Sequence, residues 1–215
     1  MRGAVIDVVQ RSPEWFAARL GRLTGSAAKD MLATIAKGEA AGRRKLRTRL
    51  TLERLTQQSQ EDSYINAAMQ WGIDHEAEAF GVYEAMTGDL VTGTGFVQHA
   101  TLMAGCSLDG HLGDFNTLLS IKCPESATHL GYLKGAGQFP TEHVGQMLHE
   151  LWITGAETYH FLSYDPRFPL PLQTFFVSVP RDEKAVAGYA EKAEAFLLEV
   201  DREVEYLTTL MKAVA

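Results

Sequence analysis

Apolar residues in the first part of the chain follow a helical spacing, and residues that start and stop helices interrupt it. Ser12, Pro13 and Glu14 form a typical helix start, and Gly21 is a typical stop. The basic segment that starts at Arg43 ends before the polar residues 57–62, and the longest segment ends at Thr87-Gly88-Asp89. We therefore expect four helices here, over residues 13–21, 24–35, 43–55 and 64–86.

The pattern changes after Gly88 to short apolar runs that turn residues separate, which is typical of strands. The expected strands lie at 90–91, 95–97, 103–107, 118–122, 158–164 and 174–179. Further helices are expected over 126–133, 141–154 and from about residue 181 almost to the end of the chain. This order predicts an α/β or α+β fold, and the lack of repeats or linkers predicts one domain over residues 1–215.

Composition adds little beyond the class of protein. The 215 residues are 46% hydrophobic and 22% charged, which is ordinary for a globular protein with a sizeable core. No apolar run approaches the roughly 20 residues that span a bilayer, and the first residues lack a secretory signal pattern. Cys106 and Cys123 are expected to be buried free thiols, so the sequence predicts a cytoplasmic protein without membrane contact.

A net charge of −7 argues against nucleic-acid binding by bulk electrostatics, but it allows a local basic channel. A basic cluster lies in the helix expected over 43–55. Its members are Arg43, Arg44, Lys45, Arg47 and Arg49. The cluster is either a solvated helix face or a surface that follows DNA phosphates, and the charges alone leave these alternatives about even.

The pattern that carries chemistry is Asp109-Gly110 followed by Ser120-Ile121-Lys122. Phosphodiester cleavage needs a metal ion, an activated water and stabilisation of the developing charge, and Mg²⁺ prefers oxygen ligands. On a strand, residues 120 and 122 share one face, and the carbonyl of Ile121 can reach a metal beside them. Lys122 would position or deprotonate the attacking water. Taken alone the pattern is weak, because Asp-Gly turns and such strands are common.

Six blocks along the chain give this pattern a context. They are Trp15 with Ala18-Arg19-Leu20-Gly21 and Thr24-Gly25-Ser26, Trp71-Gly72 with Glu76, Cys106-Ser107-Leu108-Asp109-Gly110, Lys122-Cys123-Pro124, Gln146 with Leu151-Trp152-Ile153-Thr154, and Tyr164-Asp165-Pro166-Arg167. In these blocks the chain resembles the phage lambda exonuclease or YqaJ-type viral recombinase family, within the PD-(D/E)xK nuclease superfamily. The resemblance implies a restriction-endonuclease-like core with a central mixed β-sheet flanked by helices.

The resemblance also implies roles for individual residues. The catalytic set would be Asp109, Lys122, Glu76, Ser120 and Gln146, with Asp109, Ser120, Glu76 and the Ile121 carbonyl as metal ligands. The pocket for a 5′-phosphate would be formed by Arg19, Thr24, Ser26 and Ser107. Met69 matches an apolar wedge at the duplex end, and Arg43, Arg44, Lys45 and Arg47 gain weight as part of a DNA channel. Read from the residues alone, Thr24 and Ser26 could be helix caps and Met69 could be core.

Ser120 departs from the family, which has an acid at this position. A serine hydroxyl is a poor Mg²⁺ ligand, so three explanations stay open. The serine is natural and Glu76, Asp114 or Glu125 supplies the missing charge; or it is an engineered substitution; or the protein binds DNA ends with weak catalysis. We favour the first, and we favour Glu76 over Glu125, which follows Pro124. A family arginine after the Lys-Cys-Pro block is also absent.

The resemblance implies a deoxyribonuclease of the alkaline exonuclease type. It would use Mg²⁺ or Mn²⁺ to degrade one strand of linear double-stranded DNA 5′→3′ and leave 3′ tails. It would form a toroidal homotrimer and work with a phage single-strand annealing protein in a bacterial host. The alternatives are a structure-specific endonuclease or repair nuclease, and a DNA-end-binding protein. Motifs for dinucleotide, phosphate-loop or serine-hydrolase chemistry are absent, which disfavours a metabolic enzyme.

Overall fold

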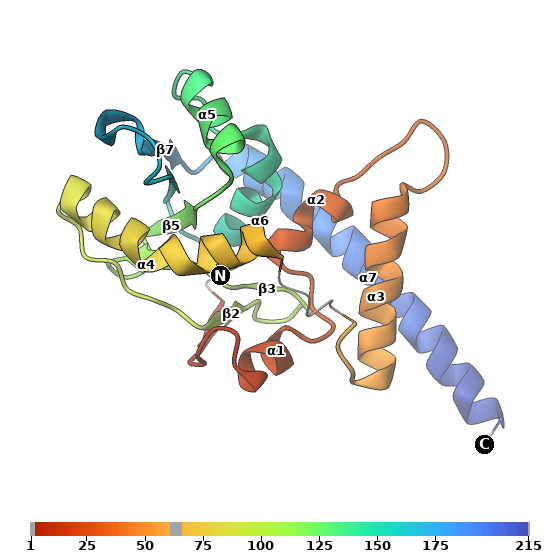
Figure 1. The fold of residues 1–215 in the computed structure, drawn as a ribbon. Helices are drawn as coiled ribbons and strands as arrows, with labels where there is room; N and C mark the ends of the chain where they lie inside the picture. The colour runs from red at the N-terminus through yellow and green to blue at the C-terminus, as the bar shows by residue number, and fades with distance from the viewer. Residues whose placement is uncertain (1–2, 61–65, 215) are drawn as a thin grey trace.

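The computed structural model describes residues 3–60 and 66–214, so residues 64 and 65 of the expected helix 64–86 lie outside the described residues. In chain order the elements are β1 (Ala4–Ile6), α1 (Pro13–Arg19), the 3-10 turn η1 (Gly25–Ala27), α2 (Ala28–Met31), α3 (Ala41–Thr56), α4 (Ala67–Thr87), β2 (Phe96–Gln98), β3 (Gly105–Cys106), β4 (Gly110–Leu112), β5 (Thr117–Lys122), α5 (Ser126–Lys134), η2 (Thr141–His143), α6 (Val144–Thr154), β6 (Thr158–Tyr164), η3 (Leu170–Leu172), β7 (Thr174–Pro180) and α7 (Glu183–Val214) (Figure 1).

Local sequence signals explain most helix ends. The Ser12 hydroxyl accepts a hydrogen bond from the Trp15 backbone N–H at 3.2 Å, which caps α1 as expected. Gly88 ends α4 in the left-handed region, at φ +79°, where glycine is favoured. The helix expected over 24–35 is instead η1 followed by one turn of α2, which ends at Met31.

The strands form two sheets. The larger has the order β4-β5-β6-β7; β5 and β6 are parallel, and the other two pairs are antiparallel. The smaller is antiparallel, with the order β1-β2-β3. The mixed sheet flanked by helices confirms the expected fold class. The expected strand 90–91 is wrong: within the described residues only an isolated bridge pairs Thr92 with His111.

Successive residues of β5 point to opposite faces of the mixed sheet. Leu119 and Ile121 pack with Tyr83 of α4 in one buried cluster. Leu118 packs with Leu151 of α6 and residues of α7 in the other cluster. By this alternation Ser120 and Lys122 lie on the α6 face of the sheet, and α4 covers the opposite face (Figure 1).

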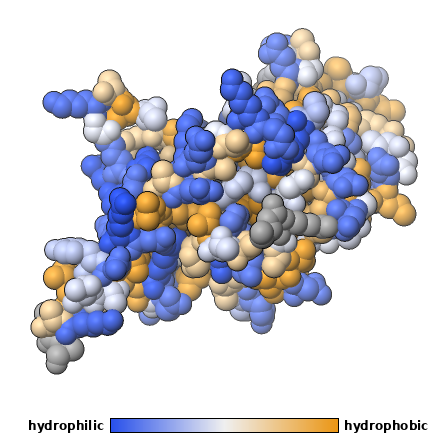
Figure 2. Space-filling model, turned by 180° about the vertical axis from the view of Figure 1, so that it is seen from behind, coloured by the Kyte–Doolittle hydropathy of each residue, from blue (hydrophilic) through white to orange (hydrophobic). Residues whose placement is uncertain are grey.

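Helices α3 and α7 lie side by side and are joined by ion pairs (Figure 1). Arg43 contacts Glu199 at 2.8 Å, and Arg47 pairs with both Glu39 and Glu203. The C-terminal part of α7 projects beyond this contact, and hydrophilic and hydrophobic residues are mixed on its surface (Figure 2). The arginines of α3 therefore fix this helix against α7.

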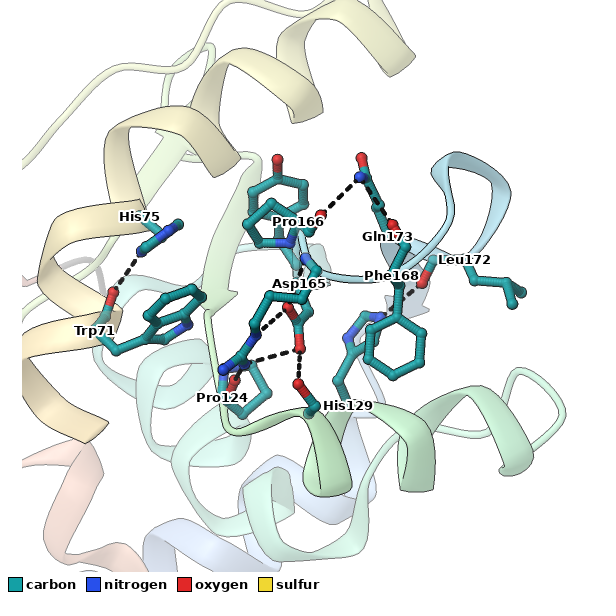
Figure 3. Close-up of polar contacts among 12 residues, drawn as sticks. Trp71, His75, Pro124, His129, Asp165, Pro166, Phe168, Leu172 and Gln173 are labelled. Carbon is teal, nitrogen blue, oxygen red and sulfur yellow. Dashed lines mark hydrogen bonds and ion pairs between the residues drawn. The ribbon is translucent and has the colours of Figure 1, made fainter. Parts of the chain in front are cut away.

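A buried carboxylate organises the loop between β6 and β7 (Figure 3). Asp165 is fully buried and accepts hydrogen bonds from the Ser126 hydroxyl at 2.7 Å and from Arg167 Nε at 2.7 Å. The guanidinium of Arg167 also lies 4.0 Å from the ring centre of Trp71 on α4, and it donates to the Pro124 carbonyl. Burial alone would raise the pKa of Asp165, but the bonds from Arg167 and Ser126 lower it to about 2.

We predict that Asp165→Asn lowers the free energy of unfolding by about 2 kcal/mol at neutral pH, because the folded state holds this carboxyl in its charged form. A carboxyl with a lowered pKa stabilises the fold above its unfolded pKa, and the contribution is lost as the pH falls. About half of the difference should be gone at pH 3. Urea titrations between pH 7 and pH 3 measure it. A matched Asp74→Asn variant, at an exposed position, should change little; a pH-independent difference for Asp165→Asn would contradict the prediction.

Candidate active site

Asp109 is the centre of the candidate site and lies directly before β4. Its Oδ2 accepts hydrogen bonds from the Ile121 backbone N–H at 2.8 Å and the Ser120 hydroxyl at 3.2 Å, and it lies 3.5 Å from Lys122 Nζ. Gly110 is required beside it, because a Cβ at this position would lie 2.3 Å from Val91 Cγ1. The structure thus brings together the hairpin residues that the sequence singled out.

Lys122 is held as a cation. Burial alone would lower the pKa of Lys122, but the negative charges of Asp109, Glu150 and Glu76 more than offset this and raise it above its ordinary value. An amine whose pKa is raised is a poor general base at neutral pH. Of the two roles expected for Lys122, positioning the attacking water therefore fits better than deprotonating it.

Glu76 reaches the site from α4. Its carboxylate lies 3.7 Å from Arg11, and burial together with the charge of Asp109 raises the pKa of Glu76. Glu76 and Asp109 line one cleft of about 470 Å³, which Glu84 and Asp7 also border. Oxygen ligands that share a cleft suit a divalent cation, and repulsion between their charges is what such a cation would relieve.

The other acids and His75 near α4 serve the fold. Glu78 accepts a hydrogen bond from the Tyr164 hydroxyl at 2.7 Å, and Glu84 accepts one from the Val91 backbone N–H at 2.9 Å. The ring of His75 bonds to the carbonyl of Trp71 and stacks on its indole (Figure 3). All three side chains are therefore engaged in contacts within the fold.

A third acid, Glu150 on α6, was not among the expected site residues. Its side chain is only 3% exposed, and it accepts hydrogen bonds from Gln146 Nε2 at 2.8 Å and from the Tyr159 hydroxyl at 2.9 Å. Burial is the main cause that raises the pKa of Glu150 to about 7; the charge of Asp109 adds to it, while Gln146 and Lys122 oppose it. Gln146, expected near the active site, thus acts here by holding Glu150.

A sequence signal for Glu150 exists but is weak. Gln146 and Glu150 are four residues apart, so they lie on one face of a helix. An acid on the buried face of an otherwise apolar helix needs partners, which makes it a candidate for function. The sequence alone does not show which side of the sheet that helix covers.

The expected phosphate pocket lies beside this network. Arg19 Nη1 donates to the Ser107 hydroxyl at 3.3 Å, and the hydroxyls of Thr24 and Ser26 are 3.3 Å apart. Arg19 and Ser26 line a pocket of about 410 Å³ that also contains Lys45 and Arg49, whereas Thr24 is buried. Thr24 therefore supports Ser26 and does not itself face the pocket.

The loop of the phosphate pocket packs directly on the acid network. A Cβ added to Gly25 would lie 3.2 Å from Glu150 Oε1 and 3.3 Å from Gln146 Cγ. Contacts this short would force Glu150 or Gln146 to shift by a few tenths of an ångström, so glycine favours the close approach. A phosphate held at Ser26 and a reaction at Asp109 would consequently belong to one continuous site.

The expected DNA-channel residues separate into two groups. Arg43 and Arg47 are engaged by Glu39, Glu199 and Glu203, so they stabilise the α3–α7 contact. Lys45 borders the phosphate pocket, and Arg44 lines a neighbouring one with Lys45 and Arg49.

Met69 is 55% exposed, as a wedge requires, and its role stays a prediction. His129, near the position of the missing family arginine, is fully buried between the Ser163 hydroxyl and the Leu172 carbonyl (Figure 3).

The donor set fits a hydrated divalent cation better than a closed cage. Among residues 3–60 and 66–214, no three His, Cys, Asp or Glu side chains come close enough together to enclose a metal ion. Mg²⁺ characteristically keeps several waters and needs only one or two carboxylates. Asp109, Glu76 and the Ile121 carbonyl can supply that set.

Comparison with known proteins identifies the family of the chain. Residues 14–157 match the YqaJ-like viral recombinase domain. The chain belongs to this family. Among solved structures it is similar to an alkaline exonuclease, LHK-Exo, from Laribacter hongkongensis, with 36% identity, a TM-score of 0.86, and coverage of 95% of this chain and 100% of that one.

A second structure, of LHK-Exo in complex with dAMP, gives 38% identity with the same TM-score and coverage. A phage-related exonuclease from Haemophilus somnus 129PT shares the fold at 12% identity and a TM-score of 0.67, over 86% of this chain and 96% of that one. No curated protein sequence matches significantly. Among the described helices, none is long and apolar enough to cross a membrane.

We predict that the Glu150 carboxyl titrates with a midpoint near pH 7 in the metal-free protein, because burial and Asp109 disfavour its charged form. Tyr159→Phe should raise the midpoint further, because it removes a donor to the carboxylate. Carbon-13 NMR of glutamate-labelled protein measures both values. A midpoint near 4.5 that Tyr159→Phe does not change would contradict the prediction.

Proposed function

We propose that the protein is a Mg²⁺-dependent nuclease that degrades one strand of linear double-stranded DNA from 5′-phosphorylated ends, in the 5′→3′ direction. The observation that carries this proposal is the phosphate pocket of Arg19, Ser26 and Ser107 beside the Asp109–Lys122 hairpin. Membership of the viral recombinase family and the similarity to an alkaline exonuclease support it. The 3′ tails that remain would be substrates for phage-type recombination.

The chemistry follows from the charges around Asp109. A bound Mg²⁺ or Mn²⁺ would polarise the scissile phosphate and lower the pKa of a coordinated water. Asp109, Glu76 and the carbonyl of Ile121 would hold that ion. Lys122, kept protonated by the surrounding carboxylates, would orient the attacking water and neutralise charge that develops on the phosphate.

The phosphate pocket gives the proposed reaction its direction. A terminal phosphate carries more negative charge than an internal one and suits a guanidinium with hydroxyl donors. Arg19 and Ser107 already contact each other, so the pocket is preorganised, and Lys45 lies on its border. Bound there, the 5′ end would leave its first phosphodiester near Asp109.

Family membership supports three further parts of the proposal. The protein would act as a single domain over residues 1–215 that assembles into a toroidal homotrimer around DNA. It would hand the 3′ tail to a phage single-strand annealing protein. It would work in the cytoplasm of a bacterial host and be phage or prophage encoded.

We predict that 5′-phosphorylated linear duplex is degraded at least about tenfold faster than 5′-hydroxyl duplex, because a charge-assisted contact contributes roughly 1.5–3 kcal/mol. Arg19→Ala should remove most of this preference, and Arg202→Ala, at an exposed position on α7, should retain it. Time courses on end-labelled DNA, with closed circles alongside, measure the rates. Equal rates on all three substrates would favour a structure-specific endonuclease.

We predict that Lys45→Gln weakens DNA binding and lowers the salt dependence of affinity by about one released ion, because Lys45 borders the phosphate pocket. Arg47→Gln should instead lower the free energy of unfolding by about 1 kcal/mol and leave affinity nearly unchanged, because Arg47 pairs with Glu39 and Glu203. Fluorescence anisotropy in EDTA and urea titrations separate the two effects. Loss of DNA affinity in Arg47→Gln at unchanged stability would place that arginine in the channel.

A further inference from the structure

The site lacks an acid on β5, where Ser120 stands, and the structure contains an unassigned acid on the same side of the sheet. Ser120 lies on the face of β5 that α6 covers, by the alternation that sends Ile121 toward α4. Glu150 is on α6, and it interacts electrostatically with both Asp109 and Lys122.

Two hydroxyl groups on neighbouring strands lie between the two positions. The Ser120 hydroxyl donates to Asp109 Oδ2. Tyr159 lies opposite Leu118 in the pairing of β5 with β6, so its side chain is on the same face of the sheet as that of Ser120, and its hydroxyl donates to Glu150 Oε2. Asp109 and Glu150 are therefore each bonded to a hydroxyl on this face of the sheet.

The candidates that the sequence offered for the missing charge fit less well. Asp114 lies in the turn at the far end of the β4–β5 hairpin, away from the residues that contact Asp109. The charge of Glu125 acts on the guanidinium of Arg167, outside the site, and helps to raise the pKa of that arginine. Glu76 comes from α4, on the face opposite Ser120, and is itself one of the acids that the family pattern already requires.

We propose that Glu150 supplies the carboxylate that Ser120 does not, so that the second acid of the metal site is carried by α6 and not by β5. The assignment rests on the proposed metal-dependent function. Gln146 then orients Glu150 toward the metal site, and Gly25 lets the phosphate-pocket loop close over both side chains. Tyr159 holds the other carboxylate oxygen.

The test measures binding of Mn²⁺ by electron paramagnetic resonance, without DNA. Glu150→Gln keeps the shape of the side chain and one of its two acceptor oxygens but removes its charge, and should weaken Mn²⁺ affinity by about tenfold or more. Ser120→Glu in the Glu150→Gln background should restore most of the affinity. Glu53→Gln, a matched change at another buried acid, bonded to the Gly21 backbone N–H, should leave it unchanged.

A structural role for Glu150 predicts a different result. It would give a loss of thermal stability in Glu150→Gln with normal Mn²⁺ affinity, or a loss of affinity that Ser120→Glu does not restore in a folded double variant. Either outcome overturns the assignment. In the unaltered protein, Mn²⁺ should broaden the carbon-13 carboxyl signals of Glu150 and Glu76 but not of Glu53; a sharp Glu150 signal at saturating Mn²⁺ also overturns it.

The same experiment distinguishes failure of this assignment from failure of the proposed function. If the unaltered protein binds no Mn²⁺ and does not degrade DNA, the nuclease proposal itself fails. If it binds Mn²⁺ and degrades DNA but Glu150→Gln does so equally well, only the role of Glu150 is wrong.

Discussion

The pairing of β5 between β4 and β6 is the constraint on which the fold and the site both depend. It fixes which side chains reach α4 and which reach α6, because successive residues of a strand point to opposite faces. The backbone N–H of Ile121 binds Asp109, so the same strand that separates the two helical layers also positions the central carboxylate. A slip of one residue would bury Lys122 against α4 and dismantle the site.

Around this strand the molecule concentrates negative charge in a region of low exposure. Asp109 raises the pKa of both Glu76 and Glu150, and Lys122 and Arg11 offset only part of the repulsion. Such an arrangement destabilises the metal-free fold and is retained where function needs it. The buried Asp165 shows the opposite solution, in which Arg167 and Ser126 satisfy the charge and lower the pKa to about 2.

Much of the fold and of the candidate site could be predicted from the sequence. The parts that could not be predicted have physical causes. Strong local signals placed the start of α1, the end of α4 and the strands β6 and β7. The pattern around Asp109 and Lys122 needed only the order of two strands.

What the sequence could not show depends on packing between distant elements. The guanidinia of Arg43 and Arg47 are occupied by acids far along the chain, and no charge pattern shows this. The importance of Glu150 depends on which face of the sheet α6 covers, which is a property of the assembled sheet.

The position of the acids bears on how the site balances charge. The charges of Asp109, Glu76 and Glu150 all act on Lys122, and Arg11 acts on Glu76, so a single negative charge remains uncompensated when all five groups are ionised. A divalent cation reverses the sign of that balance and leaves the site matched to one phosphodiester charge. Because carboxylate ligands bind metal in their deprotonated form, the ion would also draw the proton from Glu150, whose pKa is about 7 without it. An acid buried on a helix can thus be about half protonated at neutral pH in the metal-free fold and become fully charged when the cofactor binds.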